Sequence, residues 1–247
     1  MANKKMDIVI TMGGLGSRFE KVGYTIPKYQ IEVHGKTLFE WSLISLRGYD
    51  SIVNQYIFIV REGYNAKEFI RKQCKKLKIQ HYHIIEIDYL TDGQATTALL
   101  ANKVWNSENS LLIYNIDTYV KPCEMNAEEL KGDGFIPCFL GEGDHWSFVK
   151  LDSMGKAIEV REKKRISDYC TLGAYYFRTC QLYEELYKDY YSNNSNLENG
   201  EKYVAPLYNY LIQQSGEVYI SVVDKKSIHV LGTPEELEEF RNIKVDL

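Results

Sequence analysis

Short apolar runs alternate with amphipathic, helix-like segments in the first half of the chain. The runs are rich in β-branched residues and end in glycine or polar residues, which predicts buried strands at 7–12, 55–60, 81–87 and 111–116. Apolar positions at helical spacing lie between them and predict helices around 38–46, at 66–78 and at 95–104. Strands that alternate with helices of this length are typical of a parallel sheet covered on both faces.

The second half of the chain has shorter connections between its strands. Strands are predicted at 135–140, 148–151, 158–161, 172–177 and 218–223, helices at 181–190 and 206–214, and a polar surface loop at 192–200. Thr233, Pro234 and Glu236 predict a last helix, because they form a capping box with proline at the first helical position. No linker or repeat interrupts the pattern. The chain therefore predicts one α/β domain over 1–247, with a mostly parallel central sheet and an antiparallel insertion.

Composition narrows the function classes. The chain has 247 residues, of which 45% are hydrophobic, enough to bury a full core. Its formal charge of −4 argues against a nucleic-acid partner, and no apolar run approaches the ~18 residues of a membrane helix. The five cysteines form no Cys-x-x-Cys pair, which predicts reduced, buried thiols in a cytoplasmic protein.

A glycine-rich run follows the first predicted strand. Gly13, Gly14 and Gly16 leave room for an anion beside the backbone N–H groups, and Arg18 and Lys28 add charge-assisted donors. This pattern predicts a site for a polyphosphate. It is not a P-loop, since no Gly-Lys-Ser/Thr follows, and Phe19 replaces the third glycine of a dinucleotide fingerprint.

Two other segments are expected at the same edge of the sheet. Gly93 to Ala95 precede a predicted helix, and Asp117 follows the predicted strand at 111–116. Ligands of open α/β sheets bind at the carboxyl ends of the strands, so the three segments together predict one site.

The chain resembles the sugar-phosphate nucleotidyltransferases, also called nucleoside-diphosphate-sugar pyrophosphorylases. The resemblance begins with strand-Gly-Gly-x-Gly-x-Arg and a Pro-Lys pair about ten residues later. It continues in order to about residue 240, through Asp92-Gly93-Gln94-Ala95, Asn115-Ile116-Asp117, Glu162-Lys163, Gly173-Ala174-Tyr175-Tyr176-Phe177 and Gly232-Thr233-Pro234-Glu235. It is greatest to the short bacterial enzymes of capsule or surface-polysaccharide synthesis.

The resemblance implies a three-layer Rossmann-like, GT-A-like nucleotidyltransferase fold. The nucleotide-binding half would cover about 1–120 and the acceptor-binding half about 121–247. The implied reaction transfers NMP from an NTP to a phosphorylated small molecule, most simply a sugar 1-phosphate, and releases pyrophosphate and an NDP-sugar. Arg18 and Lys28 are the implied catalytic residues, and Asp117 is the implied ligand of Mg²⁺. The implied nucleotide-binding residues are Met12, Gly13, Gly14, Gly16, Ser17, Asp88 and Gly93, and the implied acceptor-binding residues are Ser147, Glu162, Lys163 and Gly173.

Three departures from the family pattern leave alternatives open. Tyr29-Gln30 replaces Pro-Leu, Ser147 replaces a glycine that contacts the sugar, and Val230 replaces a second metal-binding Asp, with Asp224 near it in sequence. A cytidylyltransferase for a small non-sugar compound, a GT-A glycosyltransferase and a non-catalytic homologue therefore stay open. So do the base, the acceptor and the oligomeric state, a homo-oligomer included.

Overall fold

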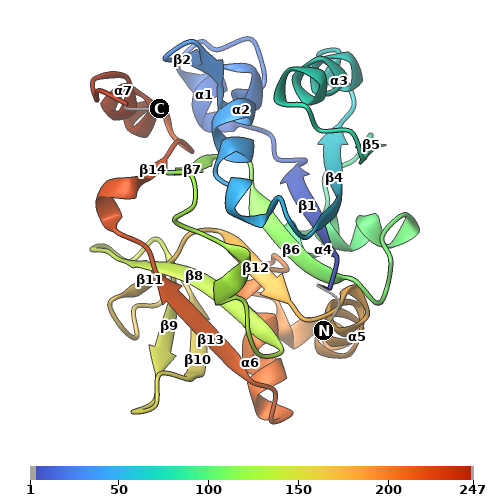
Figure 1. Ribbon diagram of the computed structural model, residues 1–247, viewed down its shortest axis with the longest axis vertical. Coiled ribbons are helices and arrows are strands. Elements are labelled where there is room, and N and C mark those ends of the chain that lie inside the picture. The colour runs from blue at the N-terminus through green and yellow to red at the C-terminus, as the bar shows by residue number, and fades with distance from the viewer. Residues whose placement is uncertain (1–3, 246–247) are drawn as a thin grey trace.

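The computed structural model describes residues 4–245 and is built on one ten-stranded mixed sheet. Its strands are β1 (Met6–Met12), β4 (Val53–Arg61), β5 (Tyr82–Ile87), β6 (Ser110–Asn115), β8 (Gly134–Leu140), β9 (Ser147–Leu151), β10 (Ala157–Glu162), β11 (Tyr169–Thr171), β12 (Ala174–Phe177) and β13 (Val218–Val222). They lie in the order β10-β9-β11-β8-β12-β6-β1-β4-β5, with β13 beside β8 (Figure 1). The strands β6, β1, β4 and β5 pair in parallel, whereas β12, β11, β9 and β10 pair antiparallel. The predicted parallel sheet with an antiparallel portion is confirmed.

Helices cover both faces of this sheet. Alternate strand residues point to opposite faces, so Ile8 and Ile10 of β1 pack in one cluster and Val9 packs in the other. The helices α2 (Leu38–Ile44) and α3 (Ala66–Leu77) contribute to the first cluster. The second cluster contains residues of α4 (Gln94–Leu99), α5 (Cys180–Tyr190) and α6 (Ala205–Gln213). The predicted three-layer architecture is confirmed.

A third, smaller core joins the two ends of the chain. It contains Phe19, Trp41, Tyr119 and Phe240, from α1 (Ser17–Lys21), α2, β7 (Thr118–Val120) and α7 (Pro234–Arg241). Figure 1 shows α7 beside α1 and the short β2 (Glu32–Val33), which pairs with β3 (Lys36–Thr37). The predicted capping box of Thr233 and Glu236 begins α7.

The sequence pattern did not predict the shortest elements. Among these, β14 (Ile228–Val230) pairs with β7 and thereby carries the segment before α7 to the end of β6. Short 3-10 helices lie at Lys28–Gln30, Arg47–Tyr49, Leu100–Lys103, Ala127–Glu129, Asn194–Asn196 and Lys225–Ser227. The predicted helix at 95–104 is therefore an α-helix that continues as a 3-10 turn.

The cysteines are free thiols, and four of them are buried as predicted. Cys123 is exposed, so the prediction of burial was wrong there. It lies with positive φ in the loop after β7, where no sheet or helix covers it.

No helix among residues 4–245 is long and apolar enough to span a membrane.

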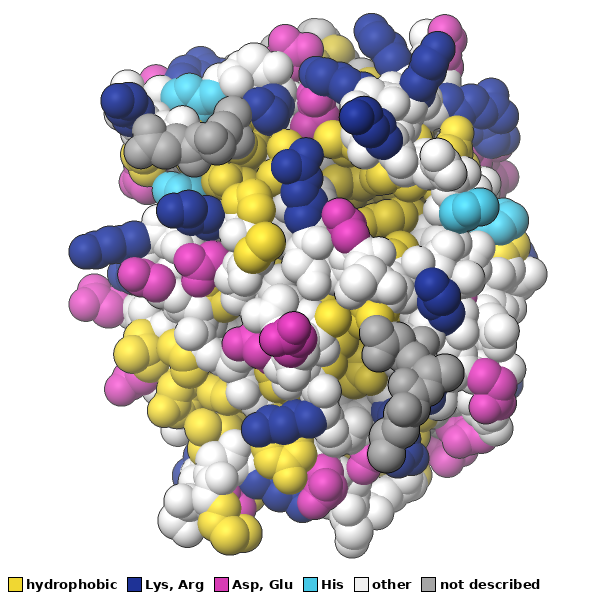
Figure 2. Space-filling model, viewed as in Figure 1, with side chains coloured by type: hydrophobic (Ala, Val, Ile, Leu, Met, Phe, Trp, Pro, Cys, Tyr) yellow, Lys and Arg dark blue, Asp and Glu magenta, His cyan; other side chains and the backbone are white. Residues whose placement is uncertain are grey.

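The face shown in Figure 2 carries Lys and Arg interspersed with Asp and Glu, rather than one continuous basic field.

A buried carboxylate ties β1 to its neighbours. Asp7 is fully buried and accepts hydrogen bonds from the side chains of Asn54, Gln55 and Asn109 and from the N–H of Asn106, at 2.8–3.2 Å. We predict that Asp7→Ala lowers the free energy of unfolding by about 3 kcal/mol, because four hydrogen bonds to a buried, charged acceptor are lost. Urea denaturation measures this loss, with the exposed Asp50→Ala as the control. A loss below about 1 kcal/mol would contradict this structural role.

Candidate active site

The carboxyl ends of the central strands bring the predicted site segments together. In the parallel pairing of β1 with β6, Thr11 lies opposite Asn115, so the glycine run after β1 and Asp117 after β6 emerge side by side. The strand β12 is antiparallel to β6, which places Gly173, just before β12, at the same edge. A Cβ on Gly173 would lie 2.2 Å from Asn115 Nδ2, and φ is +77°, so only glycine fits this close approach.

The glycine run forms one wall of a cavity of about 350 Å³, here called the glycine cavity. It is lined by Thr11, Gly13, Gly14, Leu15, Gly16, Ser17, Leu90, Thr91, Gly93, Gln94, Thr97 and Glu201. Gly16 adopts the left-handed conformation and begins α1. Among the described residues, none accepts a hydrogen bond from the backbone N–H groups of residues 15–18. These N–H groups are available to an anion.

A second cavity of about 330 Å³, here called the Glu162 cavity, adjoins the first. Its lining includes Arg18, Gln94, Asn115, Asp117, Trp146, Ser147, Glu162, Lys163, Gly173, Tyr175, Tyr203, Val230 and Glu236. Gln94 lines both cavities, and its Nε2 donates to Thr11 Oγ1 at 3.3 Å and to Asn115 Oδ1 at 2.5 Å. The two cavities therefore meet at this amide.

The floor of the Glu162 cavity is a chain of hydroxyl groups on a carboxylate. Ser147 donates to the Glu162 carboxylate, and its Oγ lies 3.5 Å from the Tyr175 hydroxyl. Tyr175 in turn lies 3.2 Å from Thr171 Oγ1. Burial raises the pKa of Glu162 above its ordinary value, although Ser147 and Lys163 oppose the shift. This floor can accept hydrogen bonds from hydroxyl or amide groups of a small molecule.

A lysine and an aspartate form an ion pair at the edge of this cavity. Lys28 Nζ lies 2.5 Å from Asp117 Oδ2, and the two side chains are 23% and 22% exposed. Leu231 N–H donates to the carbonyl of Asp117 at 2.7 Å, which fixes the loop after β14 against this turn. Lys28 itself lines a different cavity behind the glycine run, together with Met12 and Arg61.

A second carboxylate lies near Asp117. A Cβ on Gly232 would lie 3.1 Å from Asp117 Oδ2 and 3.6 Å from Glu236 Oε2, so the glycine keeps open the space that both carboxylates border. Glu236 Oε2 accepts from the N–H groups of Gly232 and Thr233 at 3.0 and 2.9 Å. Oxygen ligands of this kind suit Mg²⁺, and this donor set therefore fits the metal that the resemblance implies. No group of three or more metal-ligating His, Cys, Asp or Glu side chains occurs within residues 4–245.

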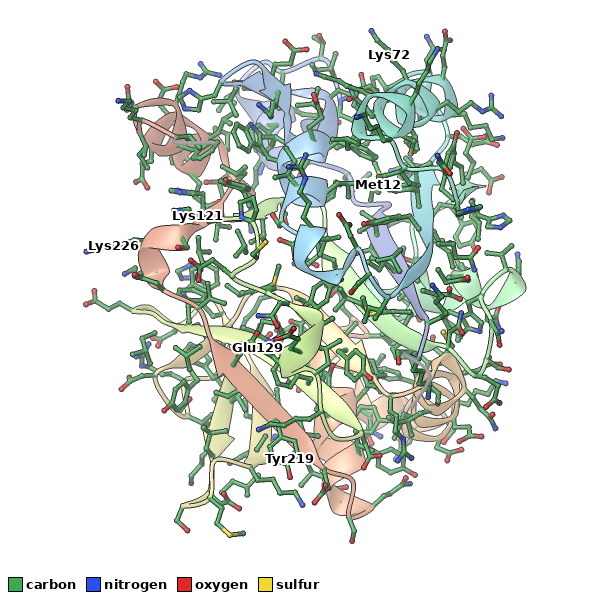
Figure 3. All side chains as sticks on the ribbon, viewed as in Figure 1. Met12, Lys72, Lys121, Glu129, Tyr219 and Lys226 are labelled. Carbon is green, nitrogen blue, oxygen red and sulfur yellow. The ribbon has the colours of Figure 1, made fainter. Side chains whose placement is uncertain are left out.

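The structure brings most of the predicted site residues to these two cavities. Of the exceptions, Met12 is buried behind the glycine run at the end of β1 (Figure 3), and Lys28 reaches the Glu162 cavity only through Asp117. Asp88 is exposed and lines neither cavity, although Leu90 and Thr91 shortly after it line the glycine cavity. Val230 lines the Glu162 cavity at the position of the family's second metal-binding Asp, and Asp224 caps the turn that begins at Lys225.

Gln94, Glu236 and Tyr203 are among the cavity residues that the sequence does not predict. Gln94 belongs to the second loop of the resemblance, which implies no role for it, and the sequence around Glu236 indicates only a helix cap. Tyr203 lines the Glu162 cavity and contacts Lys163. The dipeptide Asn199-Gly200 just before it is a hairpin signal that would have indicated an ordered segment there.

Comparisons with known proteins agree with this geometry. No model of a protein family and no curated protein matches the chain. Among solved structures, the chain is similar to the nucleoside-diphosphate-sugar pyrophosphorylase from Vibrio cholerae RC9, with 37% identity and a TM-score of 0.88. That match covers 96% of this chain and 100% of the other.

Two more distant structures show the fold alone. The inositol-1-phosphate CTP transferase from T. maritima is 16% identical, with a TM-score of 0.75 and coverage of 98% of this chain and 99% of that one. HddC from Yersinia pseudotuberculosis is 20% identical, with a TM-score of 0.64 and coverage of 95% and 99%.

The resemblance in the sequence, the fold and the 37% identity over nearly the whole chain lead to the same result. The chain belongs to the nucleoside-diphosphate-sugar pyrophosphorylases, a family of nucleotidyltransferases.

Proposed function

We propose that the protein transfers NMP from an NTP to the phosphate of a small acceptor and releases pyrophosphate. The observation that carries the proposal is the pair of adjoining cavities that share Gln94. One is bordered by free backbone N–H groups, and the other is lined by Arg18 and Lys163, so two phosphorylated molecules can meet at their junction.

In this proposal the half of the chain from 1 to about 120 binds the nucleotide. Gly13, Gly14, Gly16 and Ser17 would donate backbone hydrogen bonds to the triphosphate, with Gly93 beside the base and ribose. Leu15 and Leu90 line the same cavity, yet they are 53% and 57% exposed, and a base would cover this apolar surface. The remaining half, from about 121 to 247, would bind the acceptor.

The acceptor phosphate supplies the nucleophile. A phosphate monoester has a second pKa near 6, so at pH 7 it carries the negative charge that attacks the α-phosphorus. A bond forms between an acceptor oxygen and the α-phosphorus, and the bond from that phosphorus to the β-phosphate oxygen breaks, so pyrophosphate leaves with its electron pair. No protein nucleophile is required. Arg18 would bind the leaving pyrophosphate, Lys28 the charge at the α-phosphate and Lys163 the acceptor phosphate.

Asp117 would hold Mg²⁺, with Glu236 bordering the same space beside Gly232 and Val230 contributing no ligand. When bound, the metal neutralises the phosphate oxygens as a Lewis acid. One or two carboxylates suffice for Mg²⁺, because substrate phosphates and water complete its shell. Lys28 pairs with Asp117 Oδ2 in the free protein, so its ammonium would compete with a metal cation for this carboxylate.

A sugar 1-phosphate is the acceptor we propose, for an NDP-sugar used in capsule or surface-polysaccharide synthesis in the cytoplasm. Glu162 and the hydroxyl of Ser147 would bind sugar hydroxyl groups, and Gly173 would lie beside the sugar in the same cavity. One observation favours a second candidate, a cytidylyltransferase for a smaller non-sugar compound. The Ser147 hydroxyl donates to Glu162, at a position where the resemblance implies a glycine, and this side chain would leave less room for a sugar.

The first prediction concerns Lys28. A pyrophosphate-release assay with four NTPs and a panel of sugar 1-phosphates, phosphorylated polyols and phosphorylated amides should show release only when NTP and acceptor are both present. Lys28→Ala should lower kcat/KM by roughly 100-fold, about 2.7 kcal/mol of transition-state stabilisation. Lys72→Ala on α3, whose side chain lies at the outer edge in Figure 3, is the matched control. Unchanged kinetics in Lys28→Ala would show that this lysine has no role in catalysis. Release of NDP from an NDP-sugar would instead identify the protein as a glycosyltransferase.

The second prediction concerns the metal. Because Lys28 neutralises Asp117, Mn²⁺ should bind weakly to the free protein and tightly once NTP is present. Lys28→Met should strengthen Mn²⁺ binding without NTP by about tenfold, since the competing cation is gone. Asp117→Asn should abolish that binding and most of the turnover with little change in Tm. Electron paramagnetic resonance measures free Mn²⁺ directly. Tight binding to the wild type without nucleotide, or near-normal turnover in Asp117→Asn, would refute the assignment of Asp117.

A further inference from the structure

The segment from Glu198 to Tyr203 lies across both cavities. Glu201 lines the glycine cavity, and Tyr203 lines the Glu162 cavity. Lys202, between them, contacts the loop that begins α4. Three consecutive residues thus contact the proposed nucleotide site, its loop and the proposed acceptor site.

A tight turn holds this segment in shape. Glu198 and Glu201 exchange backbone hydrogen bonds at 3.0 and 3.1 Å, which closes a two-residue turn. Asn199 and Gly200 in that turn both have positive φ, as a primed hairpin turn requires. The conformation of residues 201–203 is therefore set locally.

The segment is also bonded to the nucleotide loop. Lys202 N–H donates to the Asp92 carbonyl at 2.7 Å, and the Lys202 carbonyl accepts from Ala95 N–H at 3.0 Å. Lys202 Nζ also lies 2.8 Å from Asp92 Oδ2. A Cβ on Gly93 would lie 2.4 Å from the Lys202 carbonyl oxygen, so this glycine permits the contact. The position of Tyr203 relative to the nucleotide loop is consequently fixed.

Tyr203 holds the ammonium group of Lys163. Lys163 Nζ donates to the Tyr203 hydroxyl at 2.8 Å and lies 4.7 Å from the centroid of the ring. Lys163 follows β10 with φ of +50°, and its N–H donates to the Trp146 carbonyl at 2.9 Å. An ammonium has three N–H donors, so one bond to Tyr203 leaves two for a phosphate.

We propose that Tyr203 is the positioning residue for Lys163, holding its ammonium at a set place between the nucleotide loop and the acceptor phosphate. The inference rests on the proposed function, in which Lys163 binds that phosphate. Without the Tyr203 oxygen the lysine keeps its charge but loses its fixed direction, and in-line attack depends on direction as well as charge.

Tyr203→Phe tests this role, because it keeps the ring and removes only the oxygen. With the NTP and acceptor that give the fastest pyrophosphate release, KM for the acceptor should rise about tenfold and kcat should fall several-fold, as expected for a lost hydrogen bond to a charged group. KM for the NTP should stay within twofold. The Tyr203 hydroxyl raises the pKa of Lys163, so the alkaline fall of kcat/KM for the acceptor should begin at lower pH in the variant.

A double-mutant cycle separates this role from a structural one. In a Lys163→Ala background Tyr203→Phe should have no further effect, since the group that it positions is absent. Tyr210→Phe on α6, which lines neither cavity, is the control and should behave as the wild type.

The possible failures are distinguishable. If no NTP and acceptor give pyrophosphate release with the wild type, the proposed function fails and this inference fails with it. If Lys163→Ala impairs acceptor use but Tyr203→Phe matches the wild type, only the positioning role is refuted. Two other results would show that Tyr203 has a structural role and would overturn the inference. One is an equal loss for NTP and acceptor together with a lower Tm, and the other is additivity of the two substitutions in the cycle.

Discussion

The parallel pairing of β1 with β6 is the constraint on which the site depends. It places Thr11 opposite Asn115, so the glycine run with Arg18 and the Asp117 turn emerge at one edge of the sheet, whereas Lys163 comes to the same cavity as Asp117 from the end of β10. Both faces of this strand pair are buried, and Asp7 binds neighbouring segments at its opposite end. A shift of the register by one residue would therefore expose apolar side chains and break the hydrogen bonds of Asp7. Gln94 links the two strand ends by bonding to both residues.

Charge compensation explains how a site for two anions is stable without them. Lys28 is neutralised by Asp117, Lys202 by Asp92, and Lys163 is bound by Tyr203 with Glu162 at 3.8 Å. These pairs are partly exposed, so each contributes little to the free energy of unfolding and a phosphate can replace the partner of a lysine at small cost. We therefore expect substrate binding to exchange these partners within a preformed site.

Much of the fold was predictable because its signals are local. The buried strand at 7–12, the basic helix at 66–78 and the capping box of Thr233 and Glu236 each depend on neighbours in sequence, and each is confirmed. The pairing of β14 with β7 and the contact of Lys202 with Gly93 were not predictable, since they join residues about 100 apart in the chain through tertiary packing. The role of Asp88 stays a prediction, since this residue follows β5 and lines neither of the two cavities.

The sequence predicted which residue types form the site, but it predicted less well which side chains contact one another there. Glycines, Arg18 and Asp117 at strand ends pointed to a phosphate site, whereas the positions of Gln94, Tyr203 and Glu236 depend on side chains that meet across the sheet.

The fate of the acceptor oxygen tests direct nucleotidyl transfer most simply. An acceptor whose phosphate carries ¹⁸O in its non-bridging positions would be incubated with NTP and the enzyme, and the product analysed by ³¹P nuclear magnetic resonance. Attack by the acceptor phosphate on the α-phosphorus predicts ¹⁸O in the bridge between the two phosphorus atoms of the product and none in pyrophosphate. Product that lacks ¹⁸O in this bridge, or NMP formed without any transfer to the acceptor, would contradict the account.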